Sequence, residues 1–189
     1  MRKIVMFNLI SLDGFFAGKD GNIDWHQVDE EFNHFAVEQT KTFGAIIFGR
    51  TTYQMFESFW PKAAMDTKMS PEDREIGHII DTIDKVVYST TLEKATWQNT
   101  KLFREINAEE VKKLKEEPGG DMVIFGSGSV VHKMTELRLI DEYRVLVNPV
   151  ILGEGKSMFG PLREQLKLKL LDSRTFGNGN VLLTYRPLH

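Results

Sequence analysis

The feature that most constrains the fold is a regular alternation of short apolar runs with longer segments of helical periodicity. Apolar runs predict buried strands at residues 4–10, 44–49, 85–89, 121–126 and 142–152. Helical patterns separate them at 30–42, 51–60, 108–117 and 130–139, and a further helix starts at Ser70-Pro71. Strands joined through helices run parallel and are covered on both faces. The sequence therefore predicts a three-layer α/β/α fold with a mostly parallel sheet.

The end of the chain departs from this alternation. The segments "KLKLLDSRTF" and "VLLTYRP" are strand-like, and "GNGN" between them is a turn signal, so we expect an antiparallel hairpin that completes a mixed sheet. A chain of 189 residues, 41% of them hydrophobic, is long enough to fill one core. No internal repeat or low-complexity linker divides it. The prediction is a single domain over residues 1–189.

Composition narrows the classes of function. The absence of cysteine excludes disulfides, thiolate zinc sites and cysteine nucleophiles, and the five histidines show no ligand spacing, so we expect no metal site. A net charge of −3, spread along the chain, argues against a protein that coats nucleic acid. No apolar run approaches the roughly 18 residues of a membrane span. We expect a cytoplasmic protein whose ligand is a small molecule.

Three of the predicted strands end in residues suited to anions. "FGRTT" carries Gly49, Arg50, Thr51 and Thr52 into a helix, and "VYSTTL" ends a strand in Ser89 and Thr90. "FGSGSVV" leads through Gly126, Ser127, Gly128, Ser129 and Val130 into another helix. The first turn of a helix has backbone N–H groups without internal partners, which favour a phosphate. These junctions predict a nucleotide ligand.

Two common nucleotide motifs do not fit. The Rossmann fingerprint requires a third glycine where Val131 stands, and the motif here lies late in the chain. A P-loop requires a glycine-lysine pair at the helix start, which "GSGSVVHK" lacks. Taken alone, Gly126 and Gly128 would favour tight strand–helix packing over a cofactor contact.

Five segments in order carry a family resemblance: "SLDGFFAGKDGNIDW", "FGRTTYQMF", "VYSTTL", "FGSGSVV" and "NPVILGEGKSMF". The chain resembles the dihydrofolate reductase-like superfamily, and within it the stand-alone proteins similar to the C-terminal reductase domain of bacterial riboflavin biosynthesis enzymes. The resemblance implies a sheet of about eight strands, NADPH bound across the carboxyl ends of those strands, and a homodimer.

Carried over by residue, the resemblance implies the cofactor contacts. Residues Gly49 to Thr52 match the segment that holds the adenosine phosphate and pyrophosphate, with a surface cap as the alternative role of Arg50. Ser89 and Thr90 match residues around the adenosine ribose and its 2′-phosphate. Residues Gly126 to Val130 match the loop beneath the pyrophosphate and nicotinamide ribose. Ala17 and Gly18 fall where backbone groups meet the nicotinamide amide. Dihydrofolate reductases have a cis Gly-Gly peptide in that loop, whereas this chain has Gly126-Ser127.

The resemblance also suggests substrate-side residues. Trp25 matches a tryptophan of the substrate site, and Asp13 belongs to an S-x-D-G signature, although Asp13-Gly14 is also a natural turn pair. Asp13 or Asp24 is expected to donate a proton, directly or through water. In the pterin enzymes a carboxylate of the next helix anchors the ring. Candidates for that role, which also suit the first turn of a helix, are Asp29, Glu30 and Glu31.

The sequence therefore predicts an NADPH-dependent reductase of a heterocyclic or ribosylamino-pyrimidine substrate. The candidate substrate is 5-amino-6-(5-phosphoribosylamino)uracil. The zinc deaminase fused to the full riboflavin enzyme is absent here, because its H-x-E and P-C-x-x-C elements are missing. The alternatives are a dihydrofolate reductase and a module that binds NADPH without turnover.

Overall fold

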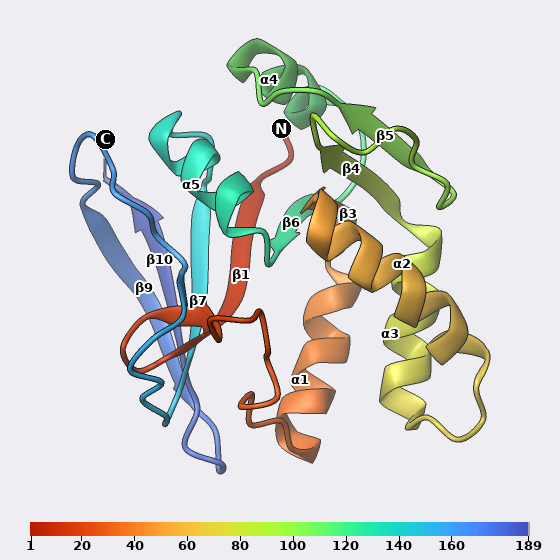
Figure 1. The fold of residues 1–189 in the computed structure, drawn as a ribbon, viewed down its shortest axis with the longest axis vertical. Helices are drawn as coiled ribbons and strands as arrows, with labels where there is room; N and C mark the ends of the chain where they lie inside the picture. The colour runs from red at the N-terminus through yellow and green to blue at the C-terminus, as the bar shows by residue number, and fades with distance from the viewer. Residues whose placement is uncertain (189) are drawn as a thin grey trace.

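A computed structural model describes residues 1–188 of the chain, and its centre is an eight-stranded sheet of order β5-β4-β3-β6-β1-β7-β10-β9 (Figure 1). The strands of this sheet are β1 (Ile4–Ser11), β3 (Phe43–Gly49), β4 (Asp84–Tyr88), β5 (Thr100–Phe103), β6 (Asp121–Phe125), β7 (Glu142–Asn148), β9 (Leu168–Thr175) and β10 (Val181–Pro187). The helices are α1 (Glu30–Lys41), α2 (Arg50–Met65), α3 (Pro71–Thr82), α4 (Ala108–Glu116) and α5 (Gly128–Glu136). None of these helices is long and apolar enough to cross a membrane.

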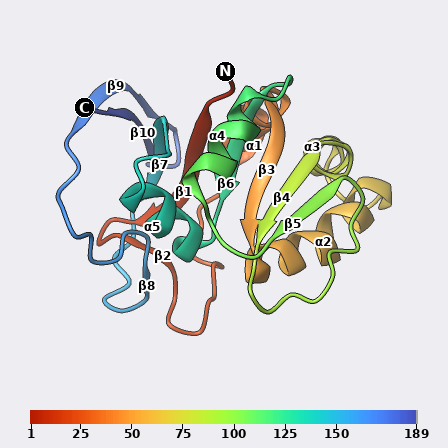
Figure 2. The same cartoon turned by 90° about the horizontal axis from the view of Figure 1, so that it is seen from above.

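The strand directions confirm the predicted mixed, mostly parallel sheet. Strands β5, β4, β3, β6, β1 and β7 pair in parallel, whereas β10 is antiparallel to both β7 and β9. Strands β4 and β5 lie at one side of the molecule and β9 and β10 at the other (Figure 2). The C-terminal hairpin predicted from "GNGN" is the β9–β10 pair, and its turn includes Gly179 with a φ of 88°.

The apolar runs are buried on both faces, as a parallel sheet requires. Along β1, Ile4 and Met6 pack with α4 and α5, whereas Val5 and Phe7 pack with α1, α2 and α3. The same alternation recurs along β3 and β6. One hydrophobic core therefore lies on each face of the sheet, between the sheet and a layer of helices.

The structure adds elements that the sequence pattern did not show. Strand β5 is short, lies at the edge of the sheet and reads T-K-L-F, so it has no buried run that would mark it. Strands β2 (Phe15–Ala17) and β8 (Lys156–Ser157) form a separate antiparallel pair. Helix α2 also continues past its predicted end at Trp60, through Pro61. Its last turn buries Ala63 and Ala64, and α3 approaches it closely at Gly77.

Candidate active site

A large cavity of about 1490 Å³ runs along the carboxyl ends of β1, β3, β4 and β6. Its walls include the first turns of α2 and α5, the loop that contains β2, and the inner faces of α1 and α3. Ligand sites of about 300–1,000 Å³ hold one drug-sized molecule. This cavity is therefore large enough for a dinucleotide together with a small substrate.

The two helices that begin at the cavity lack the caps that the others have. Asp29, Ser70 and Asn107 cap α1, α3 and α4 through their side chains. By contrast, Gly49 and Ser127, the N-cap residues of α2 and α5, make no side-chain cap hydrogen bond. The first N–H groups of both helices therefore have no side-chain cap, although Val130 N donates to the carbonyl oxygen of Ser127. The partial positive charge at each helix end favours an anion.

The glycines of the two junctions let the junctions touch. A Cβ at Gly49 would overlap Ser127 Oγ, and a Cβ at Gly126 would lie 3.1 Å from Thr52 Oγ1. A Cβ at Gly128 would lie 2.9 Å from the ring of Phe16. The glycines therefore do have a packing role. Because they allow close contact, both helix ends and the first loop lie against the same cavity.

One end of the cavity carries two arginines. Arg50 Nη1 donates to Thr91 Oγ1 over 2.8 Å, and Arg104 Nη1 donates to the carbonyl oxygens of Ser89 (3.2 Å) and Leu92 (2.6 Å). Both guanidinium groups thus flank the turn that follows β4. Ser89 Oγ is used inside this turn, because it accepts from the N–H groups of Thr91 and Leu92, whereas Thr90 is exposed.

Arg104 was missed by the sequence analysis. It follows β5, the edge strand that the apolar pattern did not reveal, so nothing marked it as a neighbour of the Ser89 turn. The available signal was local only: an arginine directly after the strand-like run T-K-L-F. Arg104 lines the same cavity as Arg50 and adds a second cation at this end, while its guanidinium also donates to the carbonyl oxygens of Ser89, Leu92 and Glu93.

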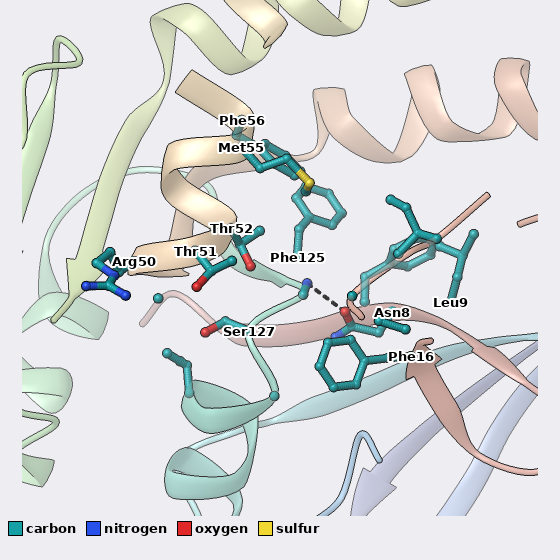
Figure 3. A pocket seen from close by; sticks show the side chains of 18 of the residues that line it. Asn8, Leu9, Phe16, Arg50, Thr51, Thr52, Met55, Phe56, Phe125 and Ser127 are labelled. Atoms are coloured by element: carbon teal, nitrogen blue, oxygen red, sulfur yellow. Dashed lines mark hydrogen bonds between the residues drawn. The ribbon is translucent and has the colours of Figure 1, made fainter. Parts of the chain in front are cut away.

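Asn8 and Tyr88, which line the cavity, also carry buried polar atoms without partners. Asn8 is 5% exposed, and its Oδ1 accepts from Gly126 N over 2.6 Å while its Nδ2 has no partner (Figure 3). Tyr88 is 6% exposed, and its Oη has no partner either. Burial raises the pKa of Tyr88, so the phenol keeps its proton and can donate. Within the described residues these two donors have no acceptor, so each would gain a hydrogen bond from an acceptor on a bound molecule.

The other end of the cavity is mostly apolar, although Asp73 of α3 also lines the cavity. Figure 3 shows Met55, Phe56, Phe125 and Leu9 at this end, away from Arg50. Side chains of α1 and α3 extend the apolar wall with Phe32, Ala36 and Ile76. His26 lines the cavity as well; burial lowers its pKa to about 4, so the imidazole is neutral at pH 7, and its Nε2 has no partner.

The structure gives the three expected catalytic residues other positions. Asp13 lies outside the cavity: its carboxylate accepts from Ser11 Oγ (2.6 Å) and from the N–H groups of Leu152 and Gly153. These hydrogen bonds, led by that from Ser11, lower its pKa. Asp24 is exposed, and the Trp25 indole donates to a backbone carbonyl; neither residue lines the cavity. This placement favours a turn role for Asp13 and does not support the catalytic roles.

The expected cofactor residues lie together, with one exception. Of the thirteen, twelve line the cavity: Ala17, Gly49, Arg50, Thr51, Thr52, Ser89, Thr90, Gly126, Ser127, Gly128, Ser129 and Val130. Gly18 does not, and its N–H donates to the carbonyl oxygen of Asn22. The chain contains no cis peptide between residues 1 and 188, so Gly126-Ser127 is trans, with Ser127 at a φ of 57°.

None of the three expected helix carboxylates lines the cavity. Asp29 caps α1 by accepting from Phe32 N, and Glu31 accepts from Arg174 and from Gly177 N. Glu30 is exposed. The polar residue that α1 does present to the cavity near its N-terminus is Asn33. Within residues 1–188, no cluster of three or more His, Asp or Glu side chains is arranged to hold a metal ion.

Comparison with known proteins connects this site to a family. The family model described as the RibD C-terminal domain matches residues 2–182. The uncharacterized protein YyaP of Bacillus subtilis (strain 168) is 33% identical over 187 residues, which cover 97% of this chain and 94% of YyaP.

Solved structures show the fold. A putative riboflavin biosynthesis protein from Shewanella sp. PV-4 superposes with a TM-score of 0.74 at 23% identity, with full coverage of both chains. Dihydrofolate reductase from Enterococcus faecalis, complexed with NADP(H), gives a TM-score of 0.64 at 14% identity, over 99% of this chain and 97% of the enzyme. These likenesses confirm the dihydrofolate reductase-like fold predicted from the sequence. The chain belongs to the RibD C-terminal domain family.

Proposed function

We propose that this protein is an NADPH-dependent reductase that transfers a hydride to a small heterocyclic substrate. The observation that carries the proposal is the polarity of the cavity along its length. Two arginines lie at one end, two uncapped helix N-termini lie in the middle, and an apolar chamber lies at the other end. A dinucleotide phosphate has the same order of charge, from the 2′-phosphate through the pyrophosphate to the nicotinamide.

The chemistry of each cavity residue suggests which part of the cofactor it contacts. Arg50 and Arg104 provide charge-assisted donors for the 2′-phosphate. Thr51, Thr52 and the first turns of α2 and α5 receive the pyrophosphate. NADPH, when bound, supplies the hydride. The apolar walls hold the acceptor carbon against the nicotinamide and exclude water, because positioning is the main demand of hydride transfer.

The substrate end favours a pyrimidine-type compound over a folate. An anchoring carboxylate for a pteridine is absent from the cavity face of α1 in the described chain, where Asn33 stands instead. We retain 5-amino-6-(5-phosphoribosylamino)uracil as the candidate substrate. Lys156 lines the cavity beside Gly21 of the first loop and is the cation we assign to its phosphate.

The proton for the reduced acceptor atom needs a new source, since Asp13 and Asp24 lie outside the cavity. Among the three aspartates of residues 13–24, Asp20 is the one that lines it. Asp20 is exposed, and its Oδ1 accepts from Asn22 N. We assign to Asp20 the transfer of a proton from solvent through water.

Calorimetric titration of the protein with NADPH and then with NADH tests the cofactor assignment. We expect selective binding of NADPH, and a loss of about tenfold or more in NADPH affinity for Arg50→Ala and Arg104→Ala with little change for NADH. Arg163→Ala is the control, because that side chain is 92% exposed. Equal losses for both cofactors would place the arginines on the pyrophosphate, and no binding of either cofactor would overturn the proposal.

Turnover separates the reductase from its alternatives. Loss of NADPH absorbance is followed with the pyrimidine and with dihydrofolate offered separately. We expect oxidation of NADPH with the pyrimidine. Oxidation with dihydrofolate alone would support the folate alternative, and tight NADPH binding without turnover would favour a sensor module.

A further inference from the structure

The side chain of Asn8 carries a buried amide that has no role in the reaction proposed above. It is 5% exposed and lines the cavity, and its Nδ2 has no hydrogen-bond partner among the described residues. A buried donor that lost its water on folding and gained no partner costs free energy. The cost is recovered only if a bound molecule supplies an acceptor.

The orientation of this amide is fixed by the sheet. Strands β1 and β6 pair with Phe7 opposite Phe125, so Asn8 and Gly126, the next residues along the chain, also lie side by side. Gly126 N donates to Asn8 Oδ1 over 2.6 Å. Because a backbone N–H can only donate, the oxygen of the amide must be on that side, and Nδ2 must point away from Gly126.

Asn8 also lies between the two segments that approach the middle of the cavity. Figure 3 shows its side chain between the turn at Gly126 and the ring of Phe16, with Leu9 and Phe125 toward the apolar end. Gly126 begins the turn into α5, and Phe16 belongs to β2, next to Ala17. Asn8 is therefore at the boundary between the phosphate-binding part of the cavity and the apolar chamber, with its Nδ2 buried beside the ring of Phe16.

We propose that Asn8 Nδ2 donates a hydrogen bond to the carboxamide oxygen of the nicotinamide. This assignment rests on the proposed use of NADPH. The carboxamide oxygen is an acceptor in both oxidation states of the cofactor. An uncharged amide suits this position, because a lysine or arginine beside the ring would repel the cationic, oxidised form. Asn8 is thus a cofactor-positioning donor that orients the ring for hydride transfer.

A fragment of the cofactor isolates this interaction. The compound 2′-phosphoadenosine-5′-diphosphoribose carries every part of NADPH except the nicotinamide. We expect Asn8→Leu, which removes the donor, to weaken NADPH by about tenfold and to leave the affinity for the fragment unchanged. Asn8→Asp keeps an acceptor for Gly126 N, and above pH 7 we expect its ionised form to lose NADPH affinity to a similar extent.

Matched measurements distinguish this role from a structural one. Asn33→Leu removes the other cavity amide, and we expect it to bind NADPH and the fragment as the unchanged protein does. Equal loss of both ligands in the Asn8 variants would show that Asn8 acts only through the Gly126 turn and would overturn the assignment, as would no loss of either.

An analogue identifies the acceptor atom. In the 3-acetylpyridine analogue of NADP⁺ a methyl group replaces the amide nitrogen and the carbonyl oxygen is kept. We expect Asn8→Leu to lose affinity for this analogue by the same factor as for NADP⁺. A loss confined to NADP⁺ would assign Asn8 to the amide nitrogen and overturn the proposal.

The failure of this assignment can be distinguished from the failure of the proposed function. If the unchanged protein binds the fragment as tightly as NADPH, only the Asn8 assignment fails. If it binds neither the fragment nor NADPH, the proposed function fails as well.

Discussion

Single atoms decide whether the two strand-to-helix junctions share one cavity wall. Gly49 and Ser127 meet so closely that any side chain at Gly49 would overlap Ser127 Oγ and lie 3.3 Å from its Cβ. Each junction is therefore a constraint on the other, although Gly49 and Ser127 are 78 positions apart in the sequence. The hydroxyl of Ser127 makes no cap hydrogen bond, and a Cβ at residue 49 would force it to move.

Gly49→Ala tests this crowding. We expect the variant to lose about 1–3 kcal/mol of unfolding free energy, the usual cost of overpacking, and to bind NADPH more weakly because the junctions separate. Urea unfolding and calorimetric titration measure both effects. Gly177→Ala is the control, since a Cβ there would make an ordinary 3.5 Å contact with Glu31.

A second substitution checks the cause. Ser127→Ala in the Gly49→Ala background removes the overlapping Oγ, so we expect part of the lost stability to return. Destabilisation of equal size with and without the Ser127 hydroxyl would contradict the proposed contact.

The burial of His26 predicts a dependence of stability on pH. Its pKa in the folded protein is about 4, below the ordinary 6.5, so the unfolded chain binds the extra proton more readily between these values. The stability associated with neutral His26 is complete above pH 6.5 and is lost as the pH falls toward 4. We expect the unfolding free energy of the unchanged protein to fall relative to that of His26→Gln over this range.

Urea unfolding at a series of pH values between 7 and 4 measures the difference. His34→Gln, which removes a histidine whose side chain is 58% exposed, is the control and should follow the unchanged protein. Parallel curves for the unchanged protein and His26→Gln would contradict the prediction.

Among the elements, α1 has polar residues at its N-terminus with two roles: one caps the helix and another joins it to the C-terminal hairpin. Asp29 closes the N-terminus of the helix, and Glu31 joins it to the β9–β10 hairpin through Arg174 and Gly177. The hydrogen bond from Gly177 N is the first cause that lowers the pKa of Glu31, followed by that from Arg174. The face that remains toward the cavity carries Asn33, which is neutral, together with apolar residues.

Asn33→Asp tests whether this face rejects a pteridine. The substitution places a carboxylate where the cavity has an amide, and a carboxylate makes charge-assisted hydrogen bonds to a cationic diaminopteridine. We expect the affinity for a 2,4-diaminopteridine, measured by calorimetry with NADPH present, to rise about tenfold or more. The control is Glu31→Asp, which leaves a carboxylate outside the cavity. Tight binding by the unchanged protein would contradict our account of this face.

At the scale of the whole molecule, β9 is the exposed edge of the sheet. All eight of its residues are exposed, and Leu168, Leu170 and Leu171 are 37%, 49% and 47% exposed. An edge strand with apolar side chains is a template for pairing, and an antiparallel pair of identical strands has the two-fold symmetry of a dimer. We propose that the predicted homodimer forms along β9.

Light scattering after size-exclusion chromatography tests this arrangement. We expect a dimer for the unchanged protein and a monomer for Leu170→Lys combined with Leu171→Lys, because two added charges on each copy oppose association. Met65→Lys, at a residue that is 77% exposed and lies at the end of α2, should remain dimeric. A monomeric unchanged protein would contradict the homodimer. The cytoplasmic location expected from the sequence also stays a prediction.

Hydrophobic periodicity was enough to predict the main strands and helices, because the buried face of each one shows in the spacing of its own apolar residues. The junctions at Gly49 and Gly126 were readable for the same reason: an apolar run, small residues and a helix start are consecutive in sequence. Most of the expected cofactor residues therefore line the cavity. The weak edge strand β5 lacked such a local signal, and Arg104 was missed with it.

Only the tertiary structure decided which side chains of residues 13–26 reach the cavity. A loop has no periodicity that assigns a side to each residue, so Asp13, Asp24 and Trp25 were chosen by resemblance, whereas Asp20 and His26 line the cavity. Asn8 was visible in the sequence as a polar break in an apolar run. Its meaning depended on the register of β1 against β6, which places Gly126 beside one atom of its amide and leaves the other free. Local pattern determined the elements of this protein, and long-range pairing decided which of their atoms form the site.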